Sequence, residues 1–361
     1  MSYISRKTQA VIDLNAIIKN YQYIDSLTGQ SNTIAVIKAD AYGHDASKVA
    51  QALSTHVNYF AVGFIDEALA LRNDKITNTV LILEGPFKES DFVVAQENNF
   101  ALMLHSNYQM AWLSSLEQEF TGDIWIKVET GMNRLGFKIE QVEQALAQLT
   151  TQQRSKVVLC SHFSTAEQIN STKPEEQLAK LMQLVNKYQC KFSMANSAGI
   201  LNWPSSHGDY TRLGLALYGV SPIAENPLSQ PLIPVMTLTA NIIAIHNVSI
   251  GETVGYGDTW QAKRETIIAT VAIGYADGYP RNAKSGTPVF INGQVASVVG
   301  RVSMDMITID ITNLVDINIG DNVELWGKNI SIDKVAQQSD TINYELLTRV
   351  SKRVPKIIEQ F

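Results

Sequence analysis

The chain has 361 residues, of which 45% are hydrophobic and 18% are charged, with a formal net charge of −6. This composition excludes a disordered chain, and the length is sufficient for two domains. The acidic balance excludes the basic surface that binds nucleic acid or an anionic membrane, so we expect a small-molecule partner, no nucleic acid and no membrane.

Two cysteines, Cys160 and Cys190, are present, without a CxxC pair or the spacing of zinc ligands. This excludes a disulfide scaffold and a structural zinc site, and we expect no metal. The first residues lack the apolar core of a signal peptide, and no run approaches the roughly 18 apolar residues of a membrane helix. We therefore expect a cytoplasmic protein.

From the start to about residue 220, short β-rich runs alternate with amphipathic stretches, which is typical of repeated βα units. The candidate strands are residues 10–14, 34–38, 59–64, 80–83, 100–104, 123–129, 156–160, 191–195 and 215–220. Their nearly continuous apolar character predicts a parallel sheet covered on both faces by helices. An open doubly wound sheet and an eight-stranded barrel both fit. The even spacing favours the barrel, with one candidate strand outside it.

The chain changes character between residues 224 and 234, where proline and polar residues replace the helical pattern. Downstream, runs that alternate with period two and a turn at Asn292-Gly293 predict a mainly-β domain with two short helices near its end. The predicted fold class is therefore α/β. Residues 1–229 are expected to form a (β/α)8 TIM barrel, and residues 230–361 the mainly-β domain.

Polar residues follow several of the predicted strands, at the edge where parallel α/β folds carry their functional sites. These residues are Lys38, Arg134, His162, Asn196, Ser197 and Arg212. Desolvation and nearby cations lower the pKa of a lysine, and the neutral amine forms a Schiff base with an aldehyde. Backbone N–H groups near Ser197 and at Gly214 and Leu215 could bind phosphate. The set suits a phosphorylated aldehyde cofactor, although each residue alone also fits a structural role.

A series of motifs extends along nearly the whole chain. They are AVIKADAYGHD (35–45), KVETGMNRLGF (127–137), SHFSTAE (161–167), ANSAGIL (195–201), TRLGLALYG (211–219), GYG (255–257), IGYADGYPR (273–281), GRVSMDM (300–306) and NYELLTRVSKRVP (343–355). Together, and in this order, they resemble the pyridoxal-phosphate-dependent alanine racemases. The resemblance implies an isomerase that interconverts L-alanine and D-alanine and supplies D-alanine for peptidoglycan synthesis.

By this resemblance, Lys38 carries pyridoxal 5'-phosphate and serves as one catalytic base. The other residues implied in cofactor binding are Tyr42, His162, Asn196, Ser197, Arg212, Gly214 and Leu215. Racemisation removes a proton from one face of a planar carbon and returns one to the other, so it needs a second base. The resemblance assigns this role to Tyr256 of the partner subunit, which makes a homodimer a catalytic requirement. His162 and Arg212 are expected to favour its phenolate form, and Arg212 also to face the pyridine nitrogen.

The substrate carboxylate is expected to meet Arg134 and the backbone N–H of Met304, by the same resemblance. Lys127 is the position of a possible carbamylated lysine that would hold Arg134 in place. The implied entrance residues are Tyr275, Arg281, Arg301 and Asp305. Two positions depart from the family pattern. Lys352 stands where some relatives have a phosphate-binding tyrosine, and Ser303 where many have cysteine, but neither is an expected base.

Three other functions are weighed against this reading. Amino-acid decarboxylases of the same fold type use a cysteine of the second domain, and residues 229–361 contain none. Short pyridoxal-phosphate homeostasis proteins lack a β domain and therefore an equivalent of Tyr256. A metal-dependent barrel hydrolase needs clustered ligands, whereas the six histidines are scattered.

Overall fold

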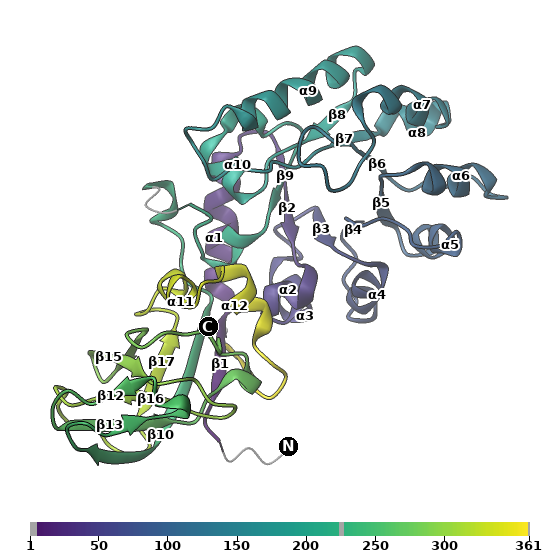
Figure 1. Cartoon of the computed structure of the whole chain (residues 1–361). Helices are drawn as coiled ribbons and strands as arrows, with labels where there is room; N and C mark the ends of the chain where they lie inside the picture. Colours follow the sequence, from purple (N-terminus) through teal and green to yellow (C-terminus); the bar gives the residue numbers. More distant parts are fainter. Residues whose placement is uncertain (1–5, 224–226, 360–361) are drawn as a thin grey trace. The chain divides into compact units, whose positions relative to one another are not determined.

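The computed structural model describes residues 6–223 and 227–359 (Figure 1). The chain divides into two compact units. The barrel unit comprises Ile17–Ala41 and Ala46–Leu232, and the β unit comprises the residues up to Ala16, Tyr42–Asp45 and the residues from Ile233 onward.

Eight parallel strands close into a barrel, as predicted. They are β2 (Asn32–Val36), β3 (Tyr59–Val62), β4 (Thr79–Ile82), β5 (Phe100–Leu104), β6 (Ile124–Lys127), β7 (Val158–Cys160), β8 (Lys191–Ser193) and β9 (Tyr210–Leu213). The ring closes where β2 pairs with β9, with Asn32 opposite Tyr210. Aromatic rings of Tyr59, Trp125 and Tyr210 pack together near the amino ends of these strands. The opposite end of the barrel is where the polar residues of the predicted site follow the strands.

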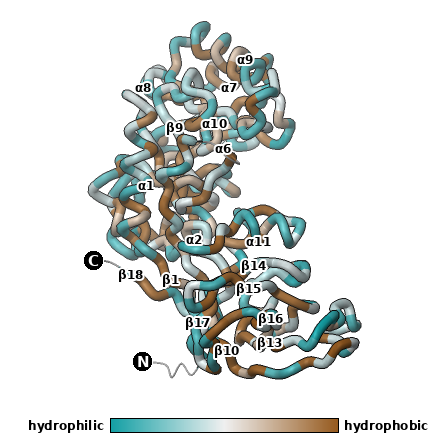
Figure 2. The backbone as a smooth tube through the Cα atoms, turned by 90° about the vertical axis from the view of Figure 1, so that its left-hand side faces the viewer, coloured by the Kyte–Doolittle hydropathy of each residue, from teal (hydrophilic) through white to brown (hydrophobic). Residues whose placement is uncertain are grey.

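Helices surround these strands on the outside (Figure 1). The helices are α1 (Leu14–Leu27), α3 (Ala46–Leu53), α4 (Ile65–Asn73), α5 (Ser90–Glu97), α6 (Asn107–Ser115), α7 (Val142–Ala147), α8 (Thr151–Lys156), α9 (Lys173–Tyr188) and α10 (Ser197–Asn202). In α9 the buried residues Gln177, Leu181, Leu184 and Val185 share one face, which is the amphipathic pattern expected of a covering helix. Brown and teal alternate along its turns in Figure 2. No helix in the described part of the chain is long and apolar enough to cross a membrane.

The β unit contains a mixed sheet in the order β13-β16-β15-β14-β17-β10-β1-β18, in which β13 also pairs with β10. These strands are β1 (Gln9–Asp13), β10 (Met236–Val248), β13 (Thr266–Val271), β14 (Pro288–Ile291), β15 (Gln294–Val299), β16 (Ile307–Asp310), β17 (Asn322–Trp326) and β18 (Lys356–Glu359). Asn292 and Gly293 have positive φ and form the predicted turn between β14 and β15. The two predicted helices are α11 (Ile332–Gln338) and α12 (Asn343–Arg349).

Two predicted strands need correction. Residues 10–13 lie in β1, which pairs with β10 and β18 of the β unit and not with the barrel, and Leu14 already begins α1. The boundary near residue 230 stays a prediction, and of the described residues, 6–16 group with the β unit. Residues 215–220 do not form a strand, because Leu215–Tyr218 is a 3-10 helix that ends at Gly219 with φ of 76°. The eighth barrel strand is β9, just before it.

Candidate active site

Lys38 lies two residues beyond β2, at the start of the short turn α2 (Lys38–Gly43). The strand was predicted to include Lys38 but ends at Val36. Ala39, Asp40, Ala41 and Tyr42 all have φ between 52° and 54°, so the turn is left-handed. Such backbone costs about 1–2 kcal/mol per non-glycine residue, which must be offset by the surrounding contacts. The Lys38 amine lies 3.9 Å from the Glu84 carboxylate.

The cations at this end of the barrel come from different strands and from the loops that follow them: Lys127 from β6, Arg212 from β9, Lys38 after β2 and Arg134 after β6. Burial lowers the pKa of the Lys127 amine to about 8, with Cys160 opposing the shift and Arg212 and Arg134 adding to it. Because an ammonium group is disfavoured there, Lys127 is poised between its charged and neutral forms near physiological pH. The region is suited to binding anionic groups.

Arg212 lies in β9 and is buried. Its guanidinium donates to the Ser193 hydroxyl at 2.6 Å and to the Ser161 carbonyl at 2.8 Å, and it lies 3.3 Å from Nδ1 of His162. Since arginine can only donate, Nδ1 of His162 must accept and the imidazole proton lies on Nε2. Arg212 and His162 are therefore in contact, and their expected effect on the Tyr256 phenol stays a prediction.

The imidazole of His162 is held neutral. Burial lowers its pKa well below the usual value, and the positive charges of Lys127, Arg212, Arg134 and Lys38 lower it further. The imidazole therefore does not add a further positive charge to the four cations at physiological pH.

Ser197 begins α10, as predicted, and Asn196 is its N-cap, with its side chain accepting the N–H of Gly199 at 2.9 Å. The Ser197 hydroxyl accepts from the backbone N–H of Gly214 at 3.0 Å and of Ala216 at 3.3 Å. The Ser197 hydroxyl therefore accepts from two backbone amides through its oxygen and keeps its own proton to donate. A hydroxyl donor beside the first residues of α10 can hold a phosphate oxygen, so the residues present fit a phosphorylated cofactor. The predicted contribution of the Leu215 amide stays a prediction.

Arg134 is exposed on the loop that follows β6. The ends of this loop are joined by two hydrogen bonds, from the Phe137 amide to the Lys127 carbonyl and from the Glu129 amide to the Phe137 carbonyl, each 2.8 Å. Gly136 has φ of 122°, and a Cβ there would lie 3.0 Å from the Lys127 carbonyl oxygen. The loop therefore fixes Arg134 relative to Lys127.

The remaining predicted residues lie in the β unit. Tyr256 is 68% exposed and stands between Gly255 and Gly257, both of which have positive φ. A Cβ on Gly257 would lie 2.9 Å from the Arg301 guanidinium, so Arg301 packs against the Tyr256 loop. The loop of Tyr256 and the side chain of Arg301 therefore lie together, although the two residues are 45 positions apart in the sequence.

A second pair of loops in the β unit joins Tyr275 to the segment around Met304. The N–H of Tyr275 donates to the Ser303 carbonyl and the N–H of Ala276 to the Met304 carbonyl, both at 3.0 Å. The Arg281 guanidinium lies 5.9 Å from the centre of the Tyr275 ring. Met304 is 53% exposed. These loops hold the predicted entrance residues close to Met304.

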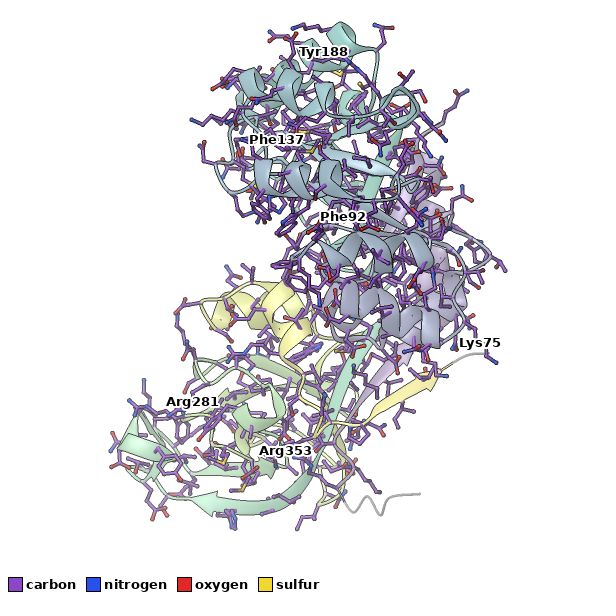
Figure 3. The ribbon with its side chains drawn as sticks, turned by 90° about the vertical axis from the view of Figure 1, so that its right-hand side faces the viewer. Lys75, Phe92, Phe137, Tyr188, Arg281 and Arg353 are labelled. Atoms are coloured by element: carbon purple, nitrogen blue, oxygen red, sulfur yellow. The ribbon has the colours of Figure 1, made fainter. Side chains whose placement is uncertain are left out.

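Asp305, the fourth predicted entrance residue, is tied down by an ion pair. Its carboxylate lies 2.6 Å from the Arg353 guanidinium, which also lies 3.5 Å from the buried carboxylate of Asp277. Figure 3 labels Arg353 and Arg281, and both lie in the β unit. Lys352, next to Arg353, is exposed.

Tyr42 also belongs to the β unit, where its ring lies 6.1 Å from that of Tyr344. Burial raises the pKa of the Tyr42 phenol above its usual range, and Tyr344 adds to the shift. The hydroxyl therefore stays protonated and can donate a hydrogen bond. Its contact with a phosphate stays a prediction.

The sequence did not point to several residues that shape this region. Glu84 faces Lys38, Glu67 contacts the turn after Lys38, and Ser161 and Ser193 hold Arg212. Each of these residues lies at the carboxyl end of a barrel strand or in the segment that follows one. That position is the feature of the sequence that could have indicated a role in the site. A lone glutamate or serine there is too common to be selected without the fold.

Two family models match the chain: "Alanine racemase, N-terminal domain" at residues 12–222 and "Alanine racemase, C-terminal domain" at residues 235–358. An alanine racemase of Alteromonas mediterranea is 41% identical, with 99% of each chain covered, and one of Pseudoalteromonas atlantica is 43% identical, with 98% of each covered. The crystal structure of the biosynthetic alanine racemase of Pseudomonas aeruginosa has a TM-score of 0.94 at 38% identity, covering 98% of this chain and 100% of that one. The alanine racemase of Bartonella henselae with covalently bound pyridoxal phosphate has a TM-score of 0.88 at 31% identity, covering 98% of this chain and 99% of that one.

Proposed function

Because this chain belongs to the alanine racemase family, we propose that its reaction is carried by Lys38 and Tyr256 as two bases on opposite faces of the substrate carbon. The protein is a pyridoxal-phosphate-dependent isomerase that interconverts L-alanine and D-alanine. When bound, the cofactor withdraws electrons from the substrate carbon and so makes its proton removable. The protein residues must bind that group, hold the substrate carboxylate and move the proton.

Lys38 is the residue that attaches the cofactor in this proposal. Its amine stands on the left-handed turn after β2, and the guanidinium groups of Arg134 and Arg212 belong to the same end of the barrel. This grouping is the observation on which the assignment of Lys38 rests. In this proposal the Lys38 amine is the nucleophile that attacks the aldehyde of the cofactor.

The other cofactor contacts are assigned around Lys38. Ser197, Gly214 and Leu215 would hold the phosphate, with Tyr42 donating from α2 and Asn196 shaping the start of α10. Arg212 would face the ring nitrogen of the cofactor, and because a guanidinium does not release its proton, that nitrogen would stay unprotonated. The guanidinium donates hydrogen bonds to the Ser193 hydroxyl and the Ser161 carbonyl, which hold it in one orientation and so support this role.

Tyr256 would act from a second copy of the chain, so we propose a homodimer with shared sites. The exposure of the Tyr256 and Met304 side chains, 68% and 53%, supports their being offered to another subunit. The N–H of Met304 and the Arg134 guanidinium would bind the substrate carboxylate. The second copy would also supply four residues that line the entrance to the site and limit the size of the substrate: Tyr275, Arg281, Arg301 and Asp305.

We also assign the protein to the cytoplasm, with D-alanine for peptidoglycan as its product. The described thiols of Cys160 and Cys190 are both unpaired, which suits a reducing compartment.

The purified protein is expected to racemise L-alanine after addition of pyridoxal phosphate. Optical rotation of an L-alanine solution should fall to zero and stay there, since the two enantiomers have equal free energy. A protein that binds the yellow cofactor but leaves the rotation unchanged would instead be a cofactor carrier, and the assignment of two bases would be wrong.

Lys127 is expected to carry a carbamate, formed from the neutral amine and carbon dioxide. Because burial lowers its pKa to about 8, the neutral fraction falls as the pH drops below that value, and it rises as the pH passes above it. Gentle native mass spectrometry in bicarbonate buffer should show one added carbon dioxide per chain above pH 8, and less below it. The adduct should be missing in Lys127→Ala and retained in Lys138→Ala, a control on the exposed surface. Absence of the adduct in the unsubstituted protein at high pH would contradict the assignment.

A further inference from the structure

The turn that carries Lys38 is bound by a carboxylate from another segment. One Glu67 oxygen accepts the backbone N–H of Ala39 at 2.6 Å. The other accepts the N–H of Gly63 at 2.7 Å and the N–H of Phe64 at 3.3 Å. A single side chain therefore links the residue directly after Lys38 to the loop directly after β3.

Part of this arrangement is ordinary helix capping. Glu67 is the third residue of α4, and its bond to the Phe64 amide is the backward half of a capping box. Capping does not require the bond to Ala39, which lies 28 residues earlier in the chain. That bond reaches the first of the left-handed residues, whose φ is 53°. Hence Glu67 does more than terminate α4.

Gly63 brings the same group of atoms into contact with the Lys38 side chain. A Cβ built on Gly63 would lie 3.3 Å from a Glu67 oxygen and 4.0 Å from both Cβ and Cδ of Lys38. The Lys38 stem therefore passes beside the backbone that Glu67 binds. Glu67 and Glu84 differ in this respect, since Glu84 faces the amine itself, at 3.9 Å.

We propose that Glu67 is a positioning residue, which fixes the left-handed turn through the Ala39 N–H and so aims the Lys38 amine. The proposal rests on the role of Lys38 given above. The carboxylate accepts one charge-assisted hydrogen bond from the turn and two from the loop after β3, so it ties the unfavourable backbone of the turn to that loop and orients the lysine that the turn carries. Without the carboxylate, the turn relaxes and the amine moves relative to the substrate carbon.

Glu67→Gln tests this because it keeps the size of the side chain but replaces one accepting oxygen with a donor, which cannot bind a backbone N–H. We expect kcat to fall by about 10- to 100-fold, with KM within about twofold, as misplacement of a catalytic group by an ångström does. Exchange of the alanine α-hydrogen in deuterated water gives a more specific signal. The face served by Lys38 should lose its exchange at least about tenfold more than the face served by Tyr256.

The matched control is Asp91→Asn. Asp91 is also a carboxylate near a helix N-terminus, and it accepts the N–H of Phe87 at 2.8 Å and of Lys88 at 3.2 Å, neither of which belongs to the turn that carries Lys38. We expect a comparable fall in melting temperature but unchanged exchange at both faces. Reduction of the cofactor onto lysine with borohydride, followed by peptide mass analysis, gives a second readout: labelling of Lys38 should be slower in Glu67→Gln than in Asp91→Asn.

The outcomes separate this proposal from the one on which it rests. Equal loss of exchange at both faces, or kinetics that match those of Asp91→Asn, would show Glu67 to be a structural cap only. If the unsubstituted protein exchanged hydrogen at neither face, the assignment of Lys38 and Tyr256 would fail instead. Glu67→Ala removes all three hydrogen bonds, and should it fail to fold, the nearly isosteric glutamine variant decides the question.

Discussion

Lys38→Ala is expected to lose both the visible absorbance of lysine-bound cofactor and at least about 10³-fold in racemisation rate. The substitution removes the only group proposed to attach the cofactor and also one of the two bases, and removal of a general acid–base group alone typically costs 10²- to 10⁴-fold. Absorbance is measured after dialysis and reloading with pyridoxal phosphate. Formation of D-alanine is followed in the same samples.

The control for this substitution is Lys75→Ala, on the barrel unit and labelled in Figure 3. Lys75 is an exposed lysine in the turn after α4 and is none of the proposed site residues. Full absorbance and activity are expected. If Lys38→Ala kept the absorbance, another lysine of the barrel would have to carry the cofactor, and the assignment of Lys38 would be wrong.

Tyr256→Phe is expected to keep the cofactor and abolish proton transfer at one face only. The ratio of kcat/KM between the two directions cannot show this, because L-alanine and D-alanine have equal free energy and that ratio is fixed for any variant. Exchange of the α-hydrogen with deuterated water can show it. One enantiomer should still exchange at the Lys38 face, whereas exchange from the other should fall by at least about 10²-fold, as should racemisation itself.

Mixed dimers test whether Tyr256 acts across subunits. A dimer of one Lys38→Ala chain and one Tyr256→Phe chain has one site with both bases intact if the sites are shared, and none if each chain uses its own tyrosine. When equal amounts of the two chains pair at random, half of the dimers are mixed, and one of the two sites in each mixed dimer is active. About a quarter of the activity of the unsubstituted protein should therefore return. No recovery, together with a proven mixed dimer, would place both bases in one chain.

The barrel could be predicted from the sequence because its strands are short apolar runs at even spacing, and burial on both faces requires such runs. The errors have physical reasons. Residues 10–14 have the composition of a strand, but the sheet that they join is decided by β10 and β18, which lie more than 200 residues further along the chain. Residues 215–220 are fully apolar or glycine, and a buried 3-10 turn satisfies that pattern as well as a strand does.

The site could be predicted only as far as its motifs extend. The contact between His162 and Arg212 and the start of α10 at Ser197 follow from residues at strand ends. The left-handed turn could not be predicted, because Ala39 and Asp40 carry no signal for positive φ, and tertiary contacts impose it. Glu67 was missed for the same reason, since its partner Ala39 is recognisable only after the turn is seen.

The placement of β1 between β10 and β18 has a consequence for how the molecule is made. β1 precedes every barrel strand in the chain, whereas its two neighbours in the sheet, β10 and the edge strand β18, follow them all. During synthesis the barrel can therefore close before β10 and β18 have been made. Until then the backbone N–H and C=O groups of residues 9–13 have no strand to pair with. If the gene were divided between the barrel and the residues from 233 onward, β1 would be expressed with the barrel fragment. The separately expressed C-terminal fragment would then leave β10 and β18 without the strand that lies between them, and such unpaired strand edges promote aggregation.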